Sequence, residues 1–359
     1  MSTSFLPLRV VEVTPETADA VAVTFAPLPE QADAFAFEAG QHLTLRAEID
    51  GEDVRRNYSL CVSPRDGRLR VGIKRIGGGL FSNWAAETLK PGATVESMTP
   101  RGHFTWTFDP SQQRHYVGFA GGSGITPILS LIATGLEVEP ESHFILIYGN
   151  RSSNSIMFLE ELAALKDRYL DRLQVYHFLD SEADDIELFN GRLDEERIAA
   201  VLRSLVDPAL VDAAFICGPG PMMDVAERAL HQAGVAPETV LVERFSTGRP
   251  AAAQAALQRE ASREAEGLMV QVTLEGRRRS IPFATGEATN ILDSARAAGM
   301  PAPYACKAGV CATCRAKLTA GKVTMLANYG LSEEEVAAGY ILTCQAIPDG
   351  EGVAVDYDA

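Results

Sequence analysis

The middle of the chain carries the run YVGFAGGSGITP at residues 116–127, and this run decides the fold of the region around it. Residues 116–120 are mostly apolar and have the length of a buried strand. A glycine-rich turn follows, and residues 127–134 have the pattern of a helix. A strand that leads through a glycine turn into a helix opens a βαβ unit, so the run predicts a parallel sheet.

Downstream, the same alternation of strand and helix is repeated. Residues 144–148 and 213–217 are short apolar runs typical of buried strands, and helical stretches follow them at 155–169 and 222–233. Together these units predict an α/β doubly wound domain over residues 113–246. In such a sheet ligands bind at the carboxyl ends of the strands, which is where the glycine-rich turns fall.

Upstream, the pattern changes to short strands. Residues 1–112 contain β-rich or alternating segments such as 21–25, 42–46 and 68–73, with Gly, Pro and Asp between them. This spacing predicts an antiparallel β-barrel. On the other side of the α/β domain, residues 247–266 are rich in Ala, Gln, Arg and Glu and are interpreted as a linker.

The last part of the chain, residues 267–359, has the pattern of a compact α+β unit. We expect a hairpin around Gly276, a helix over residues 290–298, and a short helix opened by a capping box from Ser332 to Glu335. The chain is therefore expected to be multidomain, with three domains and one linker.

Composition and charge limit the classes of function. The 359 residues are 46% apolar and 22% charged, as in an ordinary globular protein. The net charge of −16 argues against a nucleic-acid-binding protein, which needs a basic surface. No apolar run approaches the roughly 18 residues of a membrane helix, and no signal peptide is recognisable. We expect a cytoplasmic protein with no membrane or nucleic-acid partner. The six histidines show no metal-ligand spacing and receive no role.

The strongest chemical motif is a cysteine pattern in the C-terminal unit. Its members are Cys306, Cys311, Cys314 and Cys344. The spacing C-x4-C-x2-C with a distant fourth cysteine is that of a plant-type [2Fe–2S] cluster. The alternative is a structural zinc site, but zinc sites usually pair two C-x2-C-like turns, and this sequence has one such pair plus a four-residue gap.

At this point a resemblance to known families can be stated. Residues 267–359 resemble a plant-type ferredoxin, which implies a β-grasp fold, and residues 1–246 resemble the ferredoxin–NADP reductase superfamily. The resemblance implies that the barrel binds FAD, rather than FMN, and that the α/β domain binds a nicotinamide nucleotide.

Two segments of the barrel resemble the flavin-binding motifs of that superfamily. RNYS at residues 56–59 matches its R-x-Y-S signature, and KRIGGGLFS at residues 74–82 matches its second flavin segment. Ser82 is expected to open a helix whose N-terminus holds phosphate. Without the resemblance, a strand-end Tyr-Ser is usually packing and a glycine triplet a turn. The expected flavin contacts are Arg56, Asn57, Tyr58, Ser59, Lys74, Gly78, Gly79, Leu80 and Ser82.

Three segments of the α/β domain resemble the nicotinamide-nucleotide motifs, and they supply the following expected contacts: Gly122, Ser123, Gly124, Ile125, Thr126, Asn150, Arg151, Ser152, Cys217, Gly218, Pro219 and Met222. An arginine after the second strand accommodates a 2′-phosphate, so Arg151 favours NADPH over NADH. The resemblance places Cys217 beside the nicotinamide and makes Ser59, Cys217 and Glu243 the expected catalytic residues. Phe245 is expected to shield the flavin ring.

The order of reductase and then ferredoxin narrows the expected function. Residues 322–346 resemble the reductase components of bacterial phenylacetyl-CoA epoxidases (monooxygenases), which use FAD and NADPH and feed a di-iron oxygenase. The sequence thus predicts an oxidoreductase that passes electrons to a protein acceptor in phenylacetate degradation. Reductases of steroid and other ring-hydroxylating oxygenases share the layout and stay open as alternatives. A free-standing diaphorase or flavin reductase and a zinc-stabilised binding module also stay open.

Overall fold

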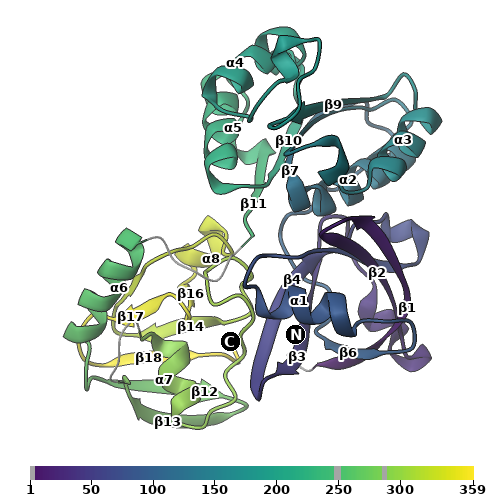
Figure 1. Ribbon diagram of the computed structural model, residues 1–359. Helices are drawn as coiled ribbons and strands as arrows, with labels where there is room; N and C mark the ends of the chain where they lie inside the picture. Colours follow the sequence, from purple (N-terminus) through teal and green to yellow (C-terminus); the bar gives the residue numbers. More distant parts are fainter. Residues whose placement is uncertain (1–4, 246–251, 285–288) are drawn as a thin grey trace. The chain divides into compact units, whose positions relative to one another are not determined.

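The computed structural model describes residues 5–245, 252–284 and 289–359. These residues form two compact units, one ending at Phe245 and the other comprising the described residues after it. Figure 1 shows the elements of each unit. Among the helices that the structure describes, none has the length and apolar character needed to cross a membrane.

The first part of the N-terminal unit is an antiparallel barrel. Its strands follow the order β4-β3-β6-β1-β2-β5, and Leu60, directly after β4, bridges Val71 of β5, so the two edge strands meet. Alternate residues point inward, and Leu43 and Leu45 of β3 are fully buried. The expected barrel is therefore confirmed. The elements are β1 (Leu6–Thr17), β2 (Ala20–Pro27), η1 (Pro29–Phe35), β3 (His42–Ile49), β4 (Glu52–Ser59), η2 (Pro64–Asp66), β5 (Leu69–Lys74), α1 (Leu80–Thr88) and β6 (Thr94–Ser97).

The second part of the N-terminal unit is a parallel sheet in the order β11-β10-β7-β8-β9. Helices α2 and α3 pack on one face and α4 and α5 on the other, as the two separate apolar cores and Figure 1 show. The elements are β7 (His115–Gly121), η3 (Gly122–Gly124), α2 (Ile125–Val138), β8 (His143–Asn150), η4 (Ser153–Ser155), α3 (Leu159–Arg168), β9 (Leu173–Leu179), η5 (Glu187–Phe189), α4 (Glu195–Ser204), η6 (Pro208–Leu210), β10 (Ala213–Cys217), α5 (Gly220–Gln232), η7 (Pro237–Thr239) and β11 (Val240–Glu243).

This strand order creates a switch point in the middle of the sheet. From β7 the chain proceeds to β8 and β9 in one direction, and β10 and β11 continue the sheet in the other. The connections diverge at the carboxyl ends of β7 and β10, which is the position where sheets of this kind bind ligands. The expected doubly wound domain is confirmed, and both of its glycine-rich turns lie at this point.

One helix begins later than the sequence pattern predicts. The stretch 155–169 has helical periodicity, but α3 begins at Leu159. The preceding Met157 and Phe158 are completely buried, and Phe158 takes the left-handed conformation with φ of 58°. This segment is fixed by tertiary packing, which overrides local propensity.

Residues of β5 join the barrel to the parallel-sheet domain. Arg70 donates hydrogen bonds to Glu16 of β1 (2.9 Å) and Glu161 of α3 (2.7 Å), and we call these three residues the Arg70 cluster. Phe158 donates its backbone N–H to Glu16 at 3.1 Å. A Cβ at Gly72 would lie 3.0 Å from the Phe158 ring, so glycine allows the two domains to pack closely there.

The C-terminal unit contains a five-stranded mixed sheet in the order β13-β12-β18-β14-β16 and a small β15–β17 pair. Strands β12 and β18 are parallel, and the other pairs are antiparallel. The hairpin around Gly276 and the capping box of Ser332 and Glu335 are present as expected. The elements are α6 (Ala252–Glu264), β12 (Met269–Leu274), β13 (Arg277–Pro282), α7 (Ile291–Ala297), β14 (Arg315–Ala320), β15 (Val323–Met325), α8 (Glu333–Ala337), β16 (Tyr340–Leu342), β17 (Ala346–Pro348) and β18 (Val353–Asp356).

The segment interpreted as a linker, residues 247–266, is in large part helix α6. Residues 247–251 of it lie outside the described residues. Ala265 is buried in the core of the C-terminal unit, and Ser262 donates its hydroxyl to the carbonyl of Thr289 at 2.8 Å. The helix therefore packs on this unit rather than acting only as a spacer, because its small side chains allow close contact with the core.

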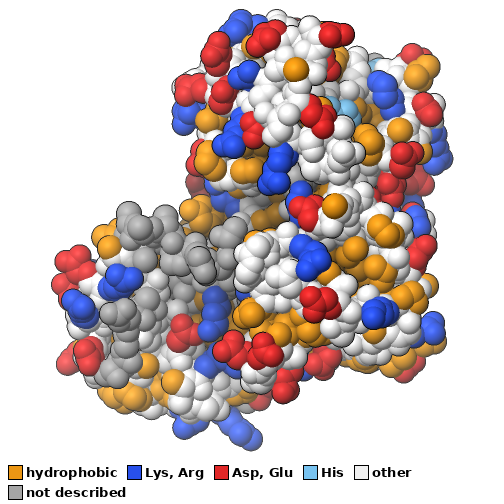
Figure 2. Space-filling view, in the orientation of Figure 1, with side chains coloured by type: hydrophobic (Ala, Val, Ile, Leu, Met, Phe, Trp, Pro, Cys, Tyr) orange, Lys and Arg blue, Asp and Glu red, His pale blue; other side chains and the backbone are white. Residues whose placement is uncertain are grey.

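Charged side chains of both signs are interspersed on the faces of the two units seen in Figure 2. The net charge of −16 is thus not concentrated in one acidic region of these visible faces. Charge alone does not mark a docking surface there.

Candidate functional site

The strand β4 carries the first flavin motif. Arg56 donates a hydrogen bond to the backbone carbonyl of Arg55 at 2.7 Å, and Asn57 accepts one from the hydroxyl of Thr44 at 2.9 Å. Both motif side chains are half-buried. These hydrogen bonds to other residues of the barrel fix the directions in which the two side chains point.

The aromatic residue of this motif packs against helix α1, and its serine is buried without a hydrogen-bond partner in the part of the chain that the structure describes. The Tyr58 and Phe81 rings lie 5.7 Å apart, and burial raises the pKa of the Tyr58 phenol. Ser59 is only 2% exposed, and its hydroxyl makes no hydrogen bond with any described residue. Buried hydroxyls rarely remain unpaired, so this position fits a site that a polar atom of a bound flavin completes.

The second flavin segment leaves β5 through a glycine turn. Lys74 lies 3.7 Å from Asp19 in an ion pair. Gly78 has φ of 72°, and nothing lies within 4 Å of the place a Cβ would take. The chain therefore presents bare backbone at Gly78, which suits close approach of a ligand. Gly79 differs, since a Cβ there would lie 2.7 Å from the Ser82 hydroxyl oxygen.

Helix α1 begins differently from the sequence expectation. The sequence predicts that Ser82 opens the helix, but the helix begins at Leu80, with Gly79 as its N-cap. Ser82 is buried, and its hydroxyl accepts the N–H of Ile76 at 3.1 Å. Its side chain thus fixes the glycine turn. Leu80 is 49% exposed at the helix start.

The two glycine-rich turns of the parallel sheet pack directly on each other. A Cβ at Gly124 would lie 2.1 Å from the carbonyl oxygen of Cys217, and one at Gly218 would lie 2.9 Å from the backbone nitrogen of Gly121. These glycines are required by contact within the protein. Gly122 is different, because its φ is 52° and no atom lies within 4 Å of its Cβ position.

The residues around these turns are largely buried. Ile125 and Thr126, in the first turn of α2, are 0% and 2% exposed, and the Ile125 N–H already donates to the carbonyls of Gly122 and Ser123. The hydroxyl of Thr126 donates to the carbonyl of Ser123 at 3.0 Å. Pro219 is the N-cap of α5, and Met222 is buried against the turn.

The loop after β8 places a carboxylate beside the expected 2′-phosphate position. Arg151 is exposed and Asn150 is buried at the strand end. Ser152 closes the loop, because its N–H donates to the Ser155 hydroxyl at 2.9 Å. In the same loop, the N–H and hydroxyl of Ser153 donate to the two carboxylate oxygens of Glu182 at 3.0 and 3.1 Å.

The expected catalytic residues of the sheet lie side by side. Cys217 ends β10 between Ala120 of β7 and Glu243 of β11, its register partners. The thiol is completely buried, and its burial, followed by the charge of Glu243, raises its pKa well above the usual value. Cys217 is therefore a neutral thiol that can donate a hydrogen bond, not a thiolate nucleophile. Phe245, just after β11, is 38% exposed.

The four cysteines of the C-terminal unit come together as two pairs. The Cys306 thiol donates to Cys311 and lowers the pKa of Cys311, and the Cys314 thiol likewise lowers the pKa of Cys344. No three His, Cys, Asp or Glu side chains within the described ranges converge as ligands of a single metal ion. Two pairs are the donor set that a two-iron cluster needs, since each iron takes two thiolates and two sulfides.

The backbone between these cysteines has an unusual conformation. Lys307, Gly309 and Ala312 have φ values of 53°, 78° and 50°. Left-handed residues among right-handed ones turn backbone N–H groups toward one concave side, where they bind anions. The N–H of Ala308 already donates to the Cys306 sulfur at 3.3 Å. The loop thus fits a negatively charged cluster.

One buried group that the sequence left without a role also belongs to the barrel. His42 opens β3 directly opposite Ser59, is 3% exposed, and has no hydrogen bond at either ring nitrogen among the described residues. Histidine spacing along the sequence gave no signal, because the two residues meet only through strand pairing.

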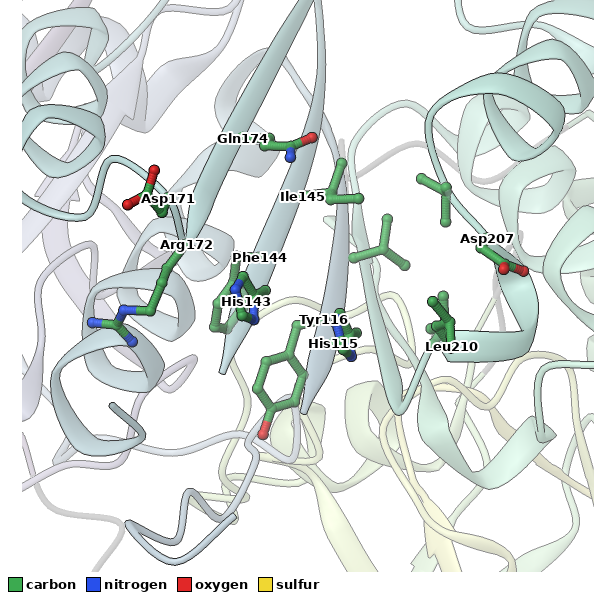
Figure 3. A pocket seen from close by; sticks show the side chains of 13 residues that line it. His115, Tyr116, His143, Phe144, Ile145, Asp171, Arg172, Gln174, Asp207 and Leu210 are labelled. Carbon is green, nitrogen blue, oxygen red and sulfur yellow. The ribbon is translucent and has the colours of Figure 1, made fainter. Parts of the chain in front are cut away.

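A cavity of about 200 Å³ lies at the end of the parallel sheet opposite the glycine-rich turns. It is lined by the amino ends of β7, β8 and β9, and Figure 3 shows His115 and His143 in its wall. Their rings are stacked with centroids 5.3 Å apart. Because nucleotides bind at the carboxyl ends of parallel strands, this cavity is separate from the candidate site.

Family models match the chain in three places. An oxidoreductase FAD-binding domain matches residues 7–106, and an oxidoreductase NAD-binding domain matches residues 119–228. A 2Fe-2S iron-sulfur cluster binding domain matches residues 272–349. These matches follow the order of the barrel, the parallel sheet and the C-terminal unit.

Two known proteins match over nearly the whole chain. A subunit of the 1,2-phenylacetyl-CoA epoxidase from Escherichia coli (strain K12) is 47% identical over 358 residues, which are 99% of each chain. The ferredoxin reductase component of 3-ketosteroid-9-alpha-monooxygenase from Rhodococcus rhodochrous is 35% identical, over 98% of this chain and 96% of that protein.

A solved structure shares the whole fold. Phthalate dioxygenase reductase, described as a modular structure for electron transfer from pyridine nucleotides to [2Fe–2S], matches with a TM-score of 0.60 and 24% identity. The match covers 98% of both chains. All three folds expected from the sequence are thus found together in one known protein.

Proposed function

The chain belongs to the family of FAD- and [2Fe–2S]-containing reductase components of oxygenases, and on that premise we propose that it carries electrons from NADPH to a phenylacetyl-CoA epoxidase. It is an oxidoreductase with binding domains for FAD, a nicotinamide nucleotide and a [2Fe–2S] cluster. The observation that carries the finer proposal is the 47% identity to the Escherichia coli epoxidase protein along the whole chain. A di-iron oxygenase as acceptor and a cytoplasmic location belong to the same proposal.

Bound FAD accepts an electron pair as hydride and the cluster carries single electrons, so the chain joins two-electron to one-electron chemistry. The protein's own contribution is position. The unpaired Ser59 hydroxyl supports a role for it at the flavin. The adjacent strand ends of Cys217, a neutral thiol, and Glu243 support a role for both at the nicotinamide. Correct placement of two reacting rings removes much of the entropic barrier to transfer.

The cluster ligands offer the sharpest test of the electron path. We expect Cys311→Ala to keep NADPH-dependent reduction of ferricyanide, which the flavin performs, and to lose reduction of cytochrome c or of an oxygenase. Cys61→Ala is the matched control, because Cys61 is also a buried free cysteine but lies in the barrel. Equal loss of both activities in Cys311→Ala would contradict separate flavin and cluster modules.

The identity of the partner needs a separate experiment. The purified chain is mixed with the oxygenase subunits of a phenylacetyl-CoA epoxidase or with those of a 3-ketosteroid monooxygenase, and NADPH oxidation coupled to product formation is measured. Coupling to the epoxidase alone supports the proposal. Coupling to the steroid oxygenase would instead identify the chain as the reductase of a steroid monooxygenase. Coupling to neither would favour a free-standing diaphorase.

The preference for NADPH depends on the loop after β8. Arg151 supports binding of a 2′-phosphate. The Glu182 carboxylate, which accepts hydrogen bonds from Ser153, opposes that binding through its negative charge. We expect Arg151→Ala to raise the KM for NADPH far more than that for NADH, and Glu182→Gln to lower the KM for NADPH selectively. An unchanged ratio in Arg151→Ala would refute the NADPH assignment.

A further inference from the structure

A buried amide follows directly after the fourth expected cluster ligand, Cys344. It belongs to Gln345, which is 7% exposed and lies in the tight turn between β16 and β17. The backbone N–H of Gln345 closes this turn by donating to the carbonyl of Leu342 at 2.8 Å. Burial of a polar amide costs free energy unless the amide finds partners, so its contacts show what the side chain serves.

The amide nitrogen of Gln345 lies among acceptors that surround the expected cluster site. It donates to the carbonyl of Lys307 at 3.1 Å and to the carbonyl of Cys344 at 3.0 Å. It also lies 3.7 Å from the sulfur of Cys344. Because carbonyl oxygens only accept, the NH2 end of the amide, and not its oxygen, must occupy this place. The positively polarised hydrogens of the amide are thus held beside a ligand sulfur.

The same side chain connects two separate parts of the ligand set. Three of the expected ligands lie on one segment, residues 306–314, which we call the cysteine loop, and Cys344 comes from the later turn. Lys307, which accepts the Gln345 bond, belongs to the cysteine loop. A Cβ at Gly309 would lie 3.1 Å from Gln345 Cγ, so the loop also packs directly on this side chain. Gln345 therefore fixes the turn of Cys344 against the loop.

A second contact joins the turn to the loop without an amide beside a sulfur. The hydroxyl of Thr343 donates to the carbonyl of Cys314 at 2.9 Å. Thr343 in turn accepts the hydroxyl of Tyr357 at 2.8 Å. This contact ends on a backbone carbonyl, whereas the Gln345 amide also lies beside a ligand atom. The two contacts can therefore be separated by experiment.

We propose that Gln345 is a positioning residue that holds Cys344 against the cysteine loop and makes the bound cluster easier to reduce. The proposal rests on the proposed function only in taking the four cysteines as the cluster ligands. Reduction adds one electron and forms or breaks no bond, so it adds one negative charge spread over irons and sulfurs. A donor beside a ligand sulfur stabilises that charge, and hydrogen bonds to the sulfurs help to set the potential of such clusters.

A redox titration of the complete holoenzyme, followed by the EPR signal of the reduced cluster, measures this effect without oxygenase or nicotinamide. Gln345→Met keeps the length of the side chain but removes both donor hydrogens. We expect the equilibrium constant for one-electron reduction to fall about tenfold, which lowers the potential by about 59 mV. Gln271→Met is the matched control, because it makes the same change at an exposed position of β12 and should leave the potential unchanged.

A further variant distinguishes stabilisation of charge from loosening of the turn. Thr343→Val removes the hydroxyl that bonds to Cys314 and leaves the Gln345 amide in place. It should release iron to a chelator faster than the native protein, while its cluster keeps a native potential. Gln345→Met should show both faster release and the lower potential. An equal fall in potential in the two variants would overturn the proposal, because loosening alone would then explain it.

A smaller change covers the case in which Gln345→Met retains too little cluster to titrate. Gln345→Asn keeps the amide but withdraws it from the sulfur by one methylene, so its potential should fall in the same direction by a smaller amount. A native potential in either variant, once it holds the cluster, would overturn the proposal and leave the proposed function intact. Native protein that binds no iron and sulfide would instead contradict the proposed function.

Discussion

Two groups of polar side chains include buried residues of the barrel, one of them completed by Glu161 of α3, and they differ in whether the described residues satisfy them. In the Arg70 cluster, one guanidinium donates to both Glu16 and Glu161. In the His42–Ser59 pair, no described residue is a partner of either side chain. Arg70 and Glu16 are 9% and 6% exposed at their side chains, and His42 and Ser59 are buried even more completely.

Buried polar side chains thus serve two different purposes in this protein. A buried charge without a partner is strongly destabilising, so a cluster that only supports the fold is completed by the protein. A pair left incomplete at a similar depth carries a cost to stability that a ligand removes. The Arg70 cluster thus joins the barrel to the nucleotide domain, whereas His42 and Ser59 stay incomplete among the described residues, and for Ser59 we propose that a bound flavin supplies the partner.

Breaking the satisfied cluster should have the largest effect. Arg70→Met leaves Glu16 buried beside Glu161 without its cation, and we expect a loss of about 3–5 kcal/mol in the free energy of unfolding of the N-terminal unit. Chemical denaturation followed by flavin fluorescence measures it. Arg192→Met is the control, because its ion pair with Asp180 is 82% exposed at the arginine, and it should change stability by less than about 0.5 kcal/mol. Equal losses of unfolding free energy in the two variants would show that the Arg70 cluster stabilises the protein no more than an exposed ion pair does.

The unsatisfied pair should give the opposite pattern. Ser59→Ala removes a buried hydroxyl that has no partner among the described residues, so the protein without flavin should be no less stable than native. Hydride transfer from NADPH should fall about 100-fold, because a placed hydrogen-bonding group is lost. Thermal unfolding and rapid-mixing kinetics on one preparation test both statements. If Ser59→Ala were destabilised but fully active, the Ser59 hydroxyl would support the fold and not the flavin.

Close packing beside the Arg70 cluster should give a smaller effect. Gly72→Ala places a Cβ 2.8 Å from the Thr126 methyl group and 3.0 Å from Met157 and the Phe158 ring. We expect a loss of about 1–3 kcal/mol, because overpacking forces these side chains to shift. Gly51→Ala is not a suitable control, since its φ is positive, and Gly77→Ala serves instead because nothing lies near its Cβ position.

The smallest effect is a pH dependence of stability. Burial, followed by repulsion from Glu161, raises the pKa of Glu16 above its usual value. The folded protein then binds this proton more tightly than the unfolded chain. The contribution of Glu16 to stability is therefore present at acid pH and is lost as pH rises through the raised pKa. In Glu16→Gln, unfolding measured across this range should lack that decline, and an unchanged slope would contradict the assignment.

Much of the fold was predictable because its signals are local. The run at 116–127 forms a strand, turn and helix through neighbouring residues alone. The same holds for the cysteine loop, whose three expected ligands lie within one turn-rich segment. Local patterns failed where distant residues decide the conformation, as at Phe158, whose left-handed backbone is held by contact with the barrel. They also missed the packing of α6 on the C-terminal unit.

The sequence by itself determined the domain order and the glycine turns, and it supplied the expected cluster ligands, because these signals are motifs of residues mostly close together in the chain. Only the tertiary structure paired His42 with Ser59, set Glu182 against Ser153, and enclosed Arg70 between two carboxylates. Strand register and domain packing bring these residues together from separate segments. No local pattern records that geometry, because it is fixed by the burial of the whole apolar core.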